Sequence, residues 1–229
     1  RYGLSAVNVG DEGGYAPPMR LTVEALDALT KAIAEAGYAA GKEVSLGMDS
    51  AASSFYVEGK GVYRVDGTEL DRDGMIEFYE RLAQSYPIVS MEDPLWEEDF
   101  DGFAELTRRI GRRVLVVGDD LFVTNVERLK KGIAIGAANA LLLKVNQIGT
   151  LTEAIEAANT AFKSQYEVVV SHRSGETLDT TIADLSVGLG ARYIKAGAPA
   201  RGERVAKYNR LLQIEEELGT DARYAGKKK

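Results

Sequence analysis

The sequence predicts an α/β fold in which parallel strands alternate with helices, arranged as in a (β/α) barrel. Strand starts are expected at intervals of 25, 27, 27 and 25 residues, near Ile88, Arg113, Ala140, Glu167 and Arg192. An amphipathic helical pattern follows each strand, and a repeat of this length is typical of βα units in a parallel sheet. The strands are short apolar runs, as expected where both faces of the sheet are covered.

Length and composition exclude several classes of protein. The 229 residues are 45% hydrophobic and 28% charged, which is ordinary for a globular protein. No apolar run approaches the roughly 20 residues that a membrane-spanning helix needs. With no cysteine, the chain has neither disulfides nor thiolate metal sites, and with no signal-peptide pattern we expect a cytoplasmic location. A net charge of −7 disfavours nucleic acid as a partner.

The N-terminal third is expected to contain one complete βα unit. Residues 1–18 are rich in glycine and read as a structured loop, followed by a helix with an apolar face over 23–33. A short strand over 44–48 comes next. A β-hairpin over 55–65 separates this strand from its helix, whose apolar stripe lies within 75–82. Including this unit, the chain has six βα units.

Local signals place the later helices. Thr124 with Glu127 and Thr150 with Glu153 have the spacing of capping boxes, and Gly219 is expected to end the last helix. The apolar stripes of the five helices after the second strand cover residues 100–110, 126–133, 151–162, 182–189 and 205–212.

An ionisable residue stands at the end of every predicted strand. In a (β/α) barrel the loops after the strands converge on one face, and catalysis takes place there. One such residue by itself is commonly a helix cap or a solvated loop residue. A set in register predicts a shared site, and we call its members the rim residues: Asp49, Glu92, Asp119, Lys144, His172 and Lys195.

Three of the rim residues, Asp49, Glu92 and Asp119, are carboxylates from adjacent units. Carboxylates that meet repel one another unless a cation lies between them, and ligands that are all oxygen indicate Mg²⁺. The single histidine argues against a zinc site. The sequence therefore predicts a magnesium site.

Lys144 follows a run of three leucines and is the candidate base. A lysine in apolar surroundings loses hydration, so its amine can accept a proton near neutral pH. The alternative is a lysine whose stem covers apolar surface while its ammonium stays in water. With Lys195 also facing the metal, the pattern suits abstraction of a proton next to a carboxylate, since the resulting enolate needs concentrated positive charge.

Two further segments complete the candidate site. The anion loop, Ser171–Thr177, offers a guanidinium, hydroxyls and an imidazole, which suit a phosphate with Arg173 as the forked donor. Its alternative is a loop whose hydroxyls cap the next helix. Glu12 stands in a glycine-rich turn and could protonate a leaving hydroxyl, or it could be an ordinary turn glutamate.

Six segments resemble signatures of the enolase (phosphopyruvate hydratase) family, in the family's order. They span nearly the whole chain and are highly specific together. The resemblance implies that residues 1–229 are part of the TIM-type barrel of the enolase C-terminal catalytic domain. It implies a lyase that reversibly dehydrates 2-phospho-D-glycerate to phosphoenolpyruvate in glycolysis and gluconeogenesis, with Mg²⁺ as cofactor. The segments are 10–14, 90–94, 118–121, 141–150, 171–177 and 197–201.

The resemblance also implies residue roles. Asp49, Glu92 and Asp119 match the Mg²⁺ ligands. Lys144 matches the base that removes the C2 proton, and Glu12 matches the acid that helps to expel the C3 hydroxyl. Substrate-binding positions of the family are matched by Glu92, Asp119, Lys144, His172, Arg173, Ser174 and Lys195.

The N-terminus departs from the family pattern. The resemblance implies that an N-terminal α+β domain, the first two barrel strands and the first barrel helix are missing. A mobile serine loop, a substrate-binding histidine and the glutamate that partners Glu12 are missing with them. A homodimer or higher homo-oligomer is expected for the full-length protein. Six strands where closure needs eight would leave unpaired strand edges, so we expect this chain to aggregate.

Two alternatives stay open. One is another lyase or isomerase of the enolase superfamily, such as a racemase or cycloisomerase, which would share the carboxylates but lack the anion loop. The other is a non-catalytic role at the cell surface or in secretion, because enolases are known to bind plasminogen through lysines and this chain ends in Lys229. For the tail Lys227–Lys229, the ordinary reading is a disordered, solubilising segment.

Overall fold

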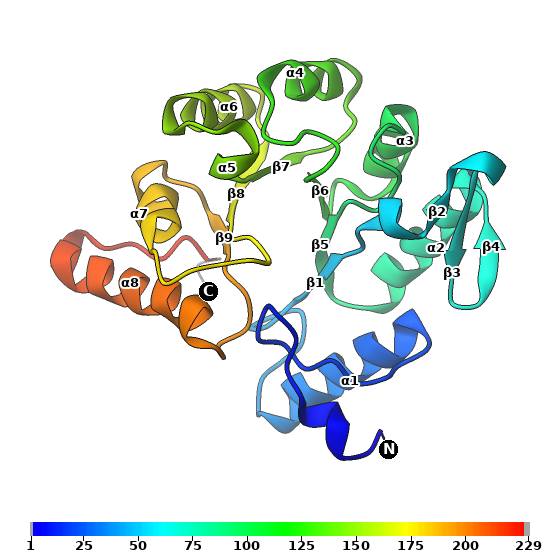
Figure 1. Ribbon diagram of the computed structural model, residues 1–229, viewed down its shortest axis with the longest axis horizontal. Helices are drawn as coiled ribbons and strands as arrows, with labels where there is room; N and C mark the ends of the chain where they lie inside the picture. Colours follow the sequence, from blue (N-terminus) through cyan, green and yellow to red (C-terminus); the bar gives the residue numbers. More distant parts are fainter. Residues whose placement is uncertain (1, 227–229) are drawn as a thin grey trace.

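A computed structural model describes residues 2–226 of the chain, so the expected disorder of Lys227–Lys229 lies outside the described residues. The fold is built on a parallel sheet of six strands in the order β1-β5-β6-β7-β8-β9. Figure 1 shows that this sheet is curled and that its helices lie around the outside. The predicted α/β fold and its six βα units are confirmed. The strands are Leu46–Asp49, Ile88–Glu92, Leu115–Gly118, Ala140–Leu143, Glu167–Ser171 and Tyr193–Lys195.

Helices follow the strands as the periodicity predicts. One short helix, α5 (Val145–Ile148), was not expected, and it follows Lys144 directly. Short 3₁₀ turns cover Leu4–Val7, Ala52–Phe55, Glu58–Lys60 and Gly219–Asp221. No described helix is both long enough and apolar enough to cross a membrane. The other helices are α1 (Thr22–Glu35), α2 (Arg72–Ser85), α3 (Phe100–Ile110), α4 (Val126–Ile135), α6 (Leu151–Lys163), α7 (Thr181–Gly188) and α8 (Gly202–Leu218).

The main core lies between the sheet and the outer helices. Strand β7 is buried along its whole length. Its Leu141 and Leu143 belong to the main core, whereas Ala140 and Leu142 pack with Val117 on the inner face of the sheet. Both faces of β7 therefore need apolar side chains, which explains the unbroken run before Lys144.

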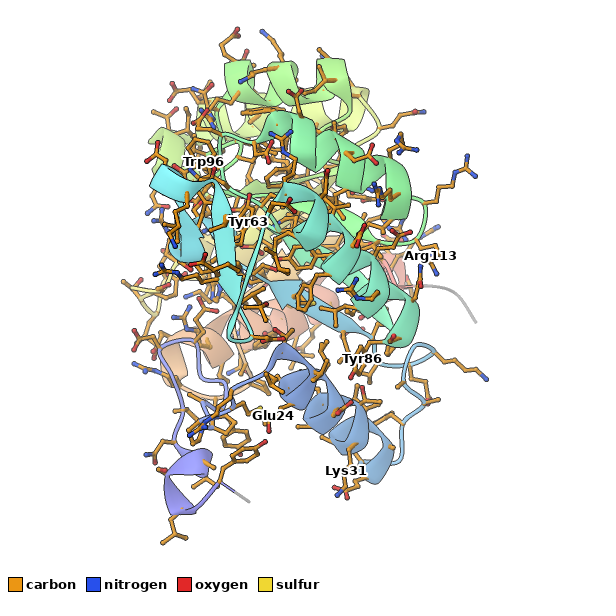
Figure 2. All side chains as sticks on the ribbon, turned by 90° about the vertical axis from the view of Figure 1, so that its right-hand side faces the viewer. Glu24, Lys31, Tyr63, Tyr86, Trp96 and Arg113 are labelled. Atoms are coloured by element: carbon orange, nitrogen blue, oxygen red, sulfur yellow. The ribbon has the colours of Figure 1, made fainter. Side chains whose placement is uncertain are left out.

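The predicted hairpin is confirmed and is larger than expected. Strands β2 (Tyr56–Val57) and β3 (Val62–Val65) pair antiparallel, and β4 (Thr68–Leu70) adds a third strand. The turn from β3 to β4 places Asp66 and Gly67 at positive φ, as a tight two-residue turn requires. Tyr63 is buried, and Figure 2 labels it and Trp96. The Tyr63 hydroxyl accepts a hydrogen bond from the backbone nitrogen of Trp96 at 3.0 Å. This contact fixes the added sheet to the loop after β5.

One predicted helix cap is wrong. Helix α4 is capped by Asn125, whose side chain accepts from the backbone nitrogens of Glu127 and Arg128. Thr124 is fully buried, and its hydroxyl instead accepts from the backbone nitrogen of Lys144 at 2.9 Å. The capping of α6 by Thr150 and the end of α8 at Gly219 are confirmed.

The sheet stays open along two edges. Among the described residues, β1 and β9 each pair with one neighbouring strand only. The glycine-rich loop that carries Glu12 lies beside the segment after β9, where the backbone nitrogen of Ala198 donates to the Glu12 carbonyl at 2.8 Å. This contact brings the N-terminal part of the chain to the carboxyl ends of the strands.

Candidate active site

The rim residues occupy equivalent places in their strands. Asp49, Glu92 and Lys195 are the last residues of β1, β5 and β9, and the other three directly follow β6, β7 and β8. Parallel pairing places Asp49 opposite Glu92. Five of the rim residues line one cavity of about 460 Å³, and Glu92 lines the adjoining one. The cavity of about 460 Å³ is also lined by Glu12, Asp93, Asp120, Asn146, Arg173 and Ser174.

Lys195 links two of the predicted metal ligands. Its Nζ donates to Asp49 Oδ2 at 2.8 Å and to both carboxylate oxygens of Glu92 at 2.8 and 2.9 Å. Burial alone would lower the pKa of Lys195, but Glu92 and Asp49 outweigh it and raise that pKa. Burial also raises the pKa of Glu92 to about 7, although Lys195 opposes the shift. The negative charge of Glu92 is therefore only partly compensated by Lys195, and a divalent cation beside this carboxylate would stabilise its ionised form.

Lys144 points into the site rather than into solvent. Its Nζ donates to Asp119 Oδ2, and its side chain is 14% exposed. The other oxygen of that carboxylate accepts from Gln147 Nε2 at 3.0 Å. Gln147 is in turn held by the buried Thr124 hydroxyl at 3.0 Å. Of the two interpretations of Lys144, the structure favours the one in which the ammonium belongs to the site.

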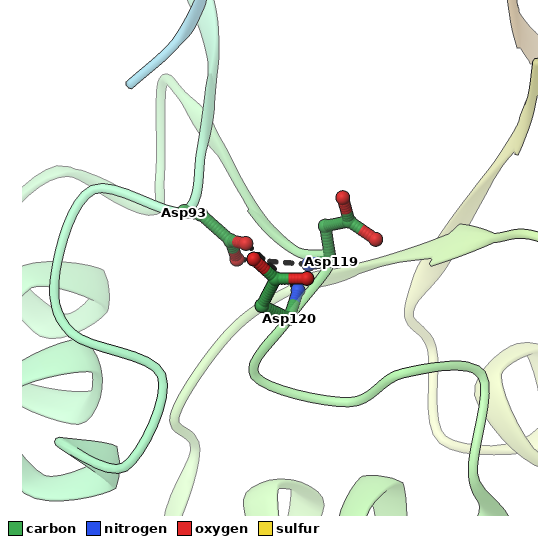
Figure 3. Close-up of side chains that lie close together, drawn as sticks. All are labelled: Asp93, Asp119 and Asp120. Carbon is green, nitrogen blue, oxygen red and sulfur yellow. Dashed lines mark hydrogen bonds between the residues drawn. The ribbon is translucent and has the colours of Figure 1, made fainter. Parts of the chain in front are cut away.

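The carboxylates that lie nearest to one another differ from the predicted set. Oxygens of Asp93, Asp119 and Asp120 lie within 4.8 Å of one another, and Asp119 alone belongs also to the predicted metal set (Figure 3). Of the predicted ligands, Asp49 and Glu92 share the ammonium of Lys195, whereas Asp119 contacts the ammonium of Lys144.

Asp93 and Asp120 were missed as site residues. The Asp93 carboxylate accepts from the backbone nitrogens of Asp119 at 2.9 Å and Asp120 at 2.7 Å, so it fixes the turn that carries Asp119. Burial raises the pKa of Asp93 to about 8. The available sequence signal was the second acidic residue directly after each of Glu92 and Asp119.

The anion loop meets Glu12 across the cavity. His172 Nε2 lies 3.4 Å from Glu12 Oε2, and the Ser174 hydroxyl lies 3.5 Å from Glu12 Oε1. Arg173 Nη1 donates to Asn146 Oδ1 at 2.9 Å, so Arg173 is held toward the loop after β7. The first backbone nitrogen of helix α7, at Thr181, donates to Asp179 Oδ1 at 2.9 Å. No hydroxyl of the anion loop accepts from a described nitrogen of α7, which argues against the interpretation of this loop as a set of helix caps.

Two buried cations lie behind the anion loop and were also missed. Arg204 and Lys207 of α8 are both fully buried. Lys207 Nζ donates to the carbonyls of Thr177 and Glu203, and Arg204 bonds to the carbonyls of the loop itself. The sequence pattern gave no signal for them, because charged residues on an amphipathic helix usually face solvent.

The comparisons with known proteins agree with the fold. A family model described as "Enolase, C-terminal TIM barrel domain" matches residues 1–229. A protein named enolase from Methanopyrus kandleri is 63% identical over 223 residues, 97% of this chain and 52% of the relative. Enolases of Pyrococcus furiosus and Methanocaldococcus jannaschii are each 60% identical, over 100% and 99% of this chain and 53% and 52% of the relatives. The chain thus spans about half the length of the curated relatives it matches.

Proposed function

The chain belongs to the enolase family, as its C-terminal barrel domain, and from this membership and the rim geometry we propose that it carries the catalytic half of a phosphopyruvate hydratase. The reaction is the reversible dehydration of 2-phospho-D-glycerate to phosphoenolpyruvate. The observation that carries the proposal is the meeting of carboxylates, lysines and the anion loop around one cavity. Racemases and cycloisomerases of the superfamily, the alternative class, have no use for a loop that suits a phosphate.

We propose Asp49, Glu92 and Asp119 as the residues that would hold Mg²⁺. Their donor atoms are all carboxylate oxygens, which this ion prefers. Burial raises the pKa of Glu92 to about 7 and so favours a cation beside it. When bound, the ion would supply positive charge against the enolate that forms on the substrate carboxylate.

The residues of the chain would divide the proton transfers. In its neutral form, Lys144 takes the proton from C2 of the substrate. Glu12 gives a proton to the C3 hydroxyl, which leaves as water. Lys195, whose pKa is raised by Glu92 and Asp49 against the effect of burial, stays an ammonium and stabilises the substrate carboxylate. His172, Arg173 and Ser174 bind the substrate on the side of the anion loop.

An absorbance assay for phosphoenolpyruvate tests this function. We would add 2-phosphoglycerate and Mg²⁺ to this chain alone, and to this chain fused to the part of the Methanopyrus kandleri relative that it does not cover. Magnesium-dependent formation of phosphoenolpyruvate supports the proposal. If the fusion folds and binds 2-phosphoglycerate but forms no product, the chain belongs to another reaction class.

The predicted oligomer, cytoplasmic location and plasminogen binding remain predictions. The lysines expected to bind plasminogen, Lys227–Lys229, lie outside the described residues. A binding assay with and without these three residues tests that role, and unchanged binding would count against it.

A further inference from the structure

Arg204 joins two loops from beneath the candidate site. This arginine lies near the start of α8 and is fully buried. Its Nη1 donates to the Arg173 carbonyl at 2.8 Å, and its Nη2 donates to the carbonyls of Ser174 at 2.8 Å and Asp11 at 2.9 Å. One guanidinium therefore ties the anion loop to the loop that carries Glu12.

The same guanidinium determines which nitrogen of His172 can hold a proton. Arg204 Nη1 lies 2.5 Å from His172 Nδ1. A guanidinium has only donors, so Nδ1 must act as the acceptor and carry no hydrogen. A neutral imidazole then carries its hydrogen on Nε2.

The other ring nitrogen, His172 Nε2, is available to a ligand in the cavity that His172 lines. The His172 side chain is 2% exposed, and its Nε2 makes no hydrogen bond to any of the described residues. A carboxylate oxygen, Glu12 Oε2, lies 3.4 Å away, and both residues line the same cavity. A buried donor with no partner carries a desolvation cost that a bound oxygen atom would remove.

We propose that Arg204 is a positioning residue that keeps His172 neutral and protonated only on Nε2. The imidazole then donates a hydrogen bond to an oxygen atom of a bound anion, and it does not take up a proton. Glu12 is left as the group that exchanges protons on this side of the cavity. The role in turnover rests on the proposed function, whereas the protonation state of the imidazole does not.

The charges around His172 are consistent with a neutral ring. Burial is the largest effect and lowers the pKa of His172, and the cations Arg204 and Lys195 lower it further. Glu12 and Glu176 oppose them by raising that pKa.

Nuclear magnetic resonance of the imidazole nitrogens tests the proposal directly. The chain has one histidine, so the ¹⁵N signals of its ring need no assignment. We expect Nε2 protonated and Nδ1 bare in the wild-type chain, with a titration midpoint below the ordinary histidine value of about 6.5. A hydrogen on Nδ1 of the neutral ring, or a midpoint at or above the ordinary value, would overturn the proposal without any variant.

A pair of variants separates this role from general packing. Arg204→Met removes the donor and the charge, and we expect the His172 midpoint to rise by about one pH unit. Lys207→Met is the matched control, because Lys207 is an equally buried cation of the same helix that bonds to the same loop without contacting His172. Its midpoint should move by less than about 0.3 unit. Equal shifts in the two variants would show that the packing of the anion loop, and not Arg204, determines the titration midpoint of His172.

Two provisions keep the test decisive. If Arg204→Met does not fold, Arg204→Lys replaces it, and the loss of the forked donor should still raise the midpoint; an unchanged midpoint would contradict the proposal. The nitrogen signals are read without turnover. Failure of the phosphoenolpyruvate assay would therefore count against the proposed function and leave this result standing.

Discussion

Lys144 and Lys195 both end at the rim, but their partners suit them to different tasks. Lys195 contacts the carboxylates of two residues, Asp49 and Glu92, and these raise its pKa against the effect of burial. It therefore remains an ammonium at neutral pH and suits charge stabilisation rather than proton abstraction. Among residues 2–226, the carboxylate that Lys144 contacts is that of Asp119, and Lys144 is left as the candidate base.

Lys144→Ala tests the assignment of the base. In the fusion that forms phosphoenolpyruvate, we expect this change to slow exchange of the C2 proton by about 10³-fold or more, since general bases typically contribute 10² to 10⁴. Binding of 2-phosphoglycerate should weaken far less. Hydrogen–deuterium exchange followed by mass spectrometry measures the first effect, and calorimetry measures the second. Lys163→Ala, at an exposed lysine of α6, is the control, and retained exchange in Lys144→Ala would assign the base elsewhere.

We expect Asp93 to make the free energy of unfolding of the metal-free chain depend on pH. Burial raises its pKa to about 8, compared with about 3.9 in an unfolded chain. Between these values the folded chain holds a proton that the unfolded chain has released, so the contribution of Asp93 to the free energy of unfolding falls as pH rises. Asp93→Asn should remove this contribution. Urea unfolding at several pH values between about 5 and 8 gives the free energy of unfolding at each pH. The contribution of Asp93 is the difference between the wild type and the variant in the slope of this free energy against pH.

The comparison with a second variant isolates the effect of burial. Asp221→Asn changes an exposed aspartate and should leave the slope of the free energy of unfolding against pH as in the wild type. If the wild-type chain gains stability with rising pH relative to Asp93→Asn, then Asp93 is ionised in the folded chain and its backbone hydrogen bonds outweigh burial.

The contact between β6 and α4 depends on two glycines that flank one ring. A Cβ atom at Gly118 or at Gly132 would overlap the ring of Phe122. We expect Gly132→Ala to lower the free energy of unfolding by about 1–2 kcal/mol, because overpacking costs more than the helix propensity gained. Urea unfolding measures the change. Replacing the ring by a smaller side chain, in Gly132→Ala/Phe122→Leu, should recover part of the lost stability.

A glycine in an open position provides the control for that prediction. A Cβ atom at Gly188 of α7 would meet no atom within 4 Å. Gly188→Ala should therefore be neutral or stabilise the chain by up to about 1 kcal/mol. If both glycine variants lose the same stability, the space around Phe122 is not the cause.

Local sequence patterns were sufficient to predict the helices and strands. The predictions that failed concern side chains whose partners lie far away in the sequence. The repeat of strand and helix is a local signal, and it was sufficient to place the rim residues at the strand ends. Thr124 has the spacing of a cap, but its hydroxyl bonds to the backbone of Lys144, 20 residues away. No periodicity encodes that contact.

The candidate site shows the same division. Asp93 meets Asp119 and Asp120 because its carboxylate accepts from their backbone nitrogens, 26 and 27 residues away, so the spacing of acidic residues could not rank this group. Arg204 and Lys207 carry charges that a helix normally turns to solvent, and only the packed α8 reveals that carbonyl groups surround them.

At the scale of the whole molecule, the curled sheet has an inner face that the described helices do not cover (Figure 1). A cavity of about 740 Å³ lies along it, lined by apolar side chains that include Val89, Leu115, Val169 and Tyr193. Val89 is 41% exposed and Tyr193 36% exposed. Beside this face, β1 and β9 have no second partner strand among the described residues. Apolar surface next to free strand edges favours association between chains.

Val89→Lys therefore tests whether the inner face drives self-association. Sedimentation of the wild-type chain should give an apparent mass above 24.8 kDa that grows with concentration, and a charge on the inner face should lower it. Val187→Lys is the matched control, because Val187 is also 41% exposed but lies on α7, outside the sheet. A wild-type chain that sediments as a monomer would contradict the prediction. Equal effects of the two lysines would attribute any change to net charge alone, since only one of them alters the face that an unclosed sheet exposes.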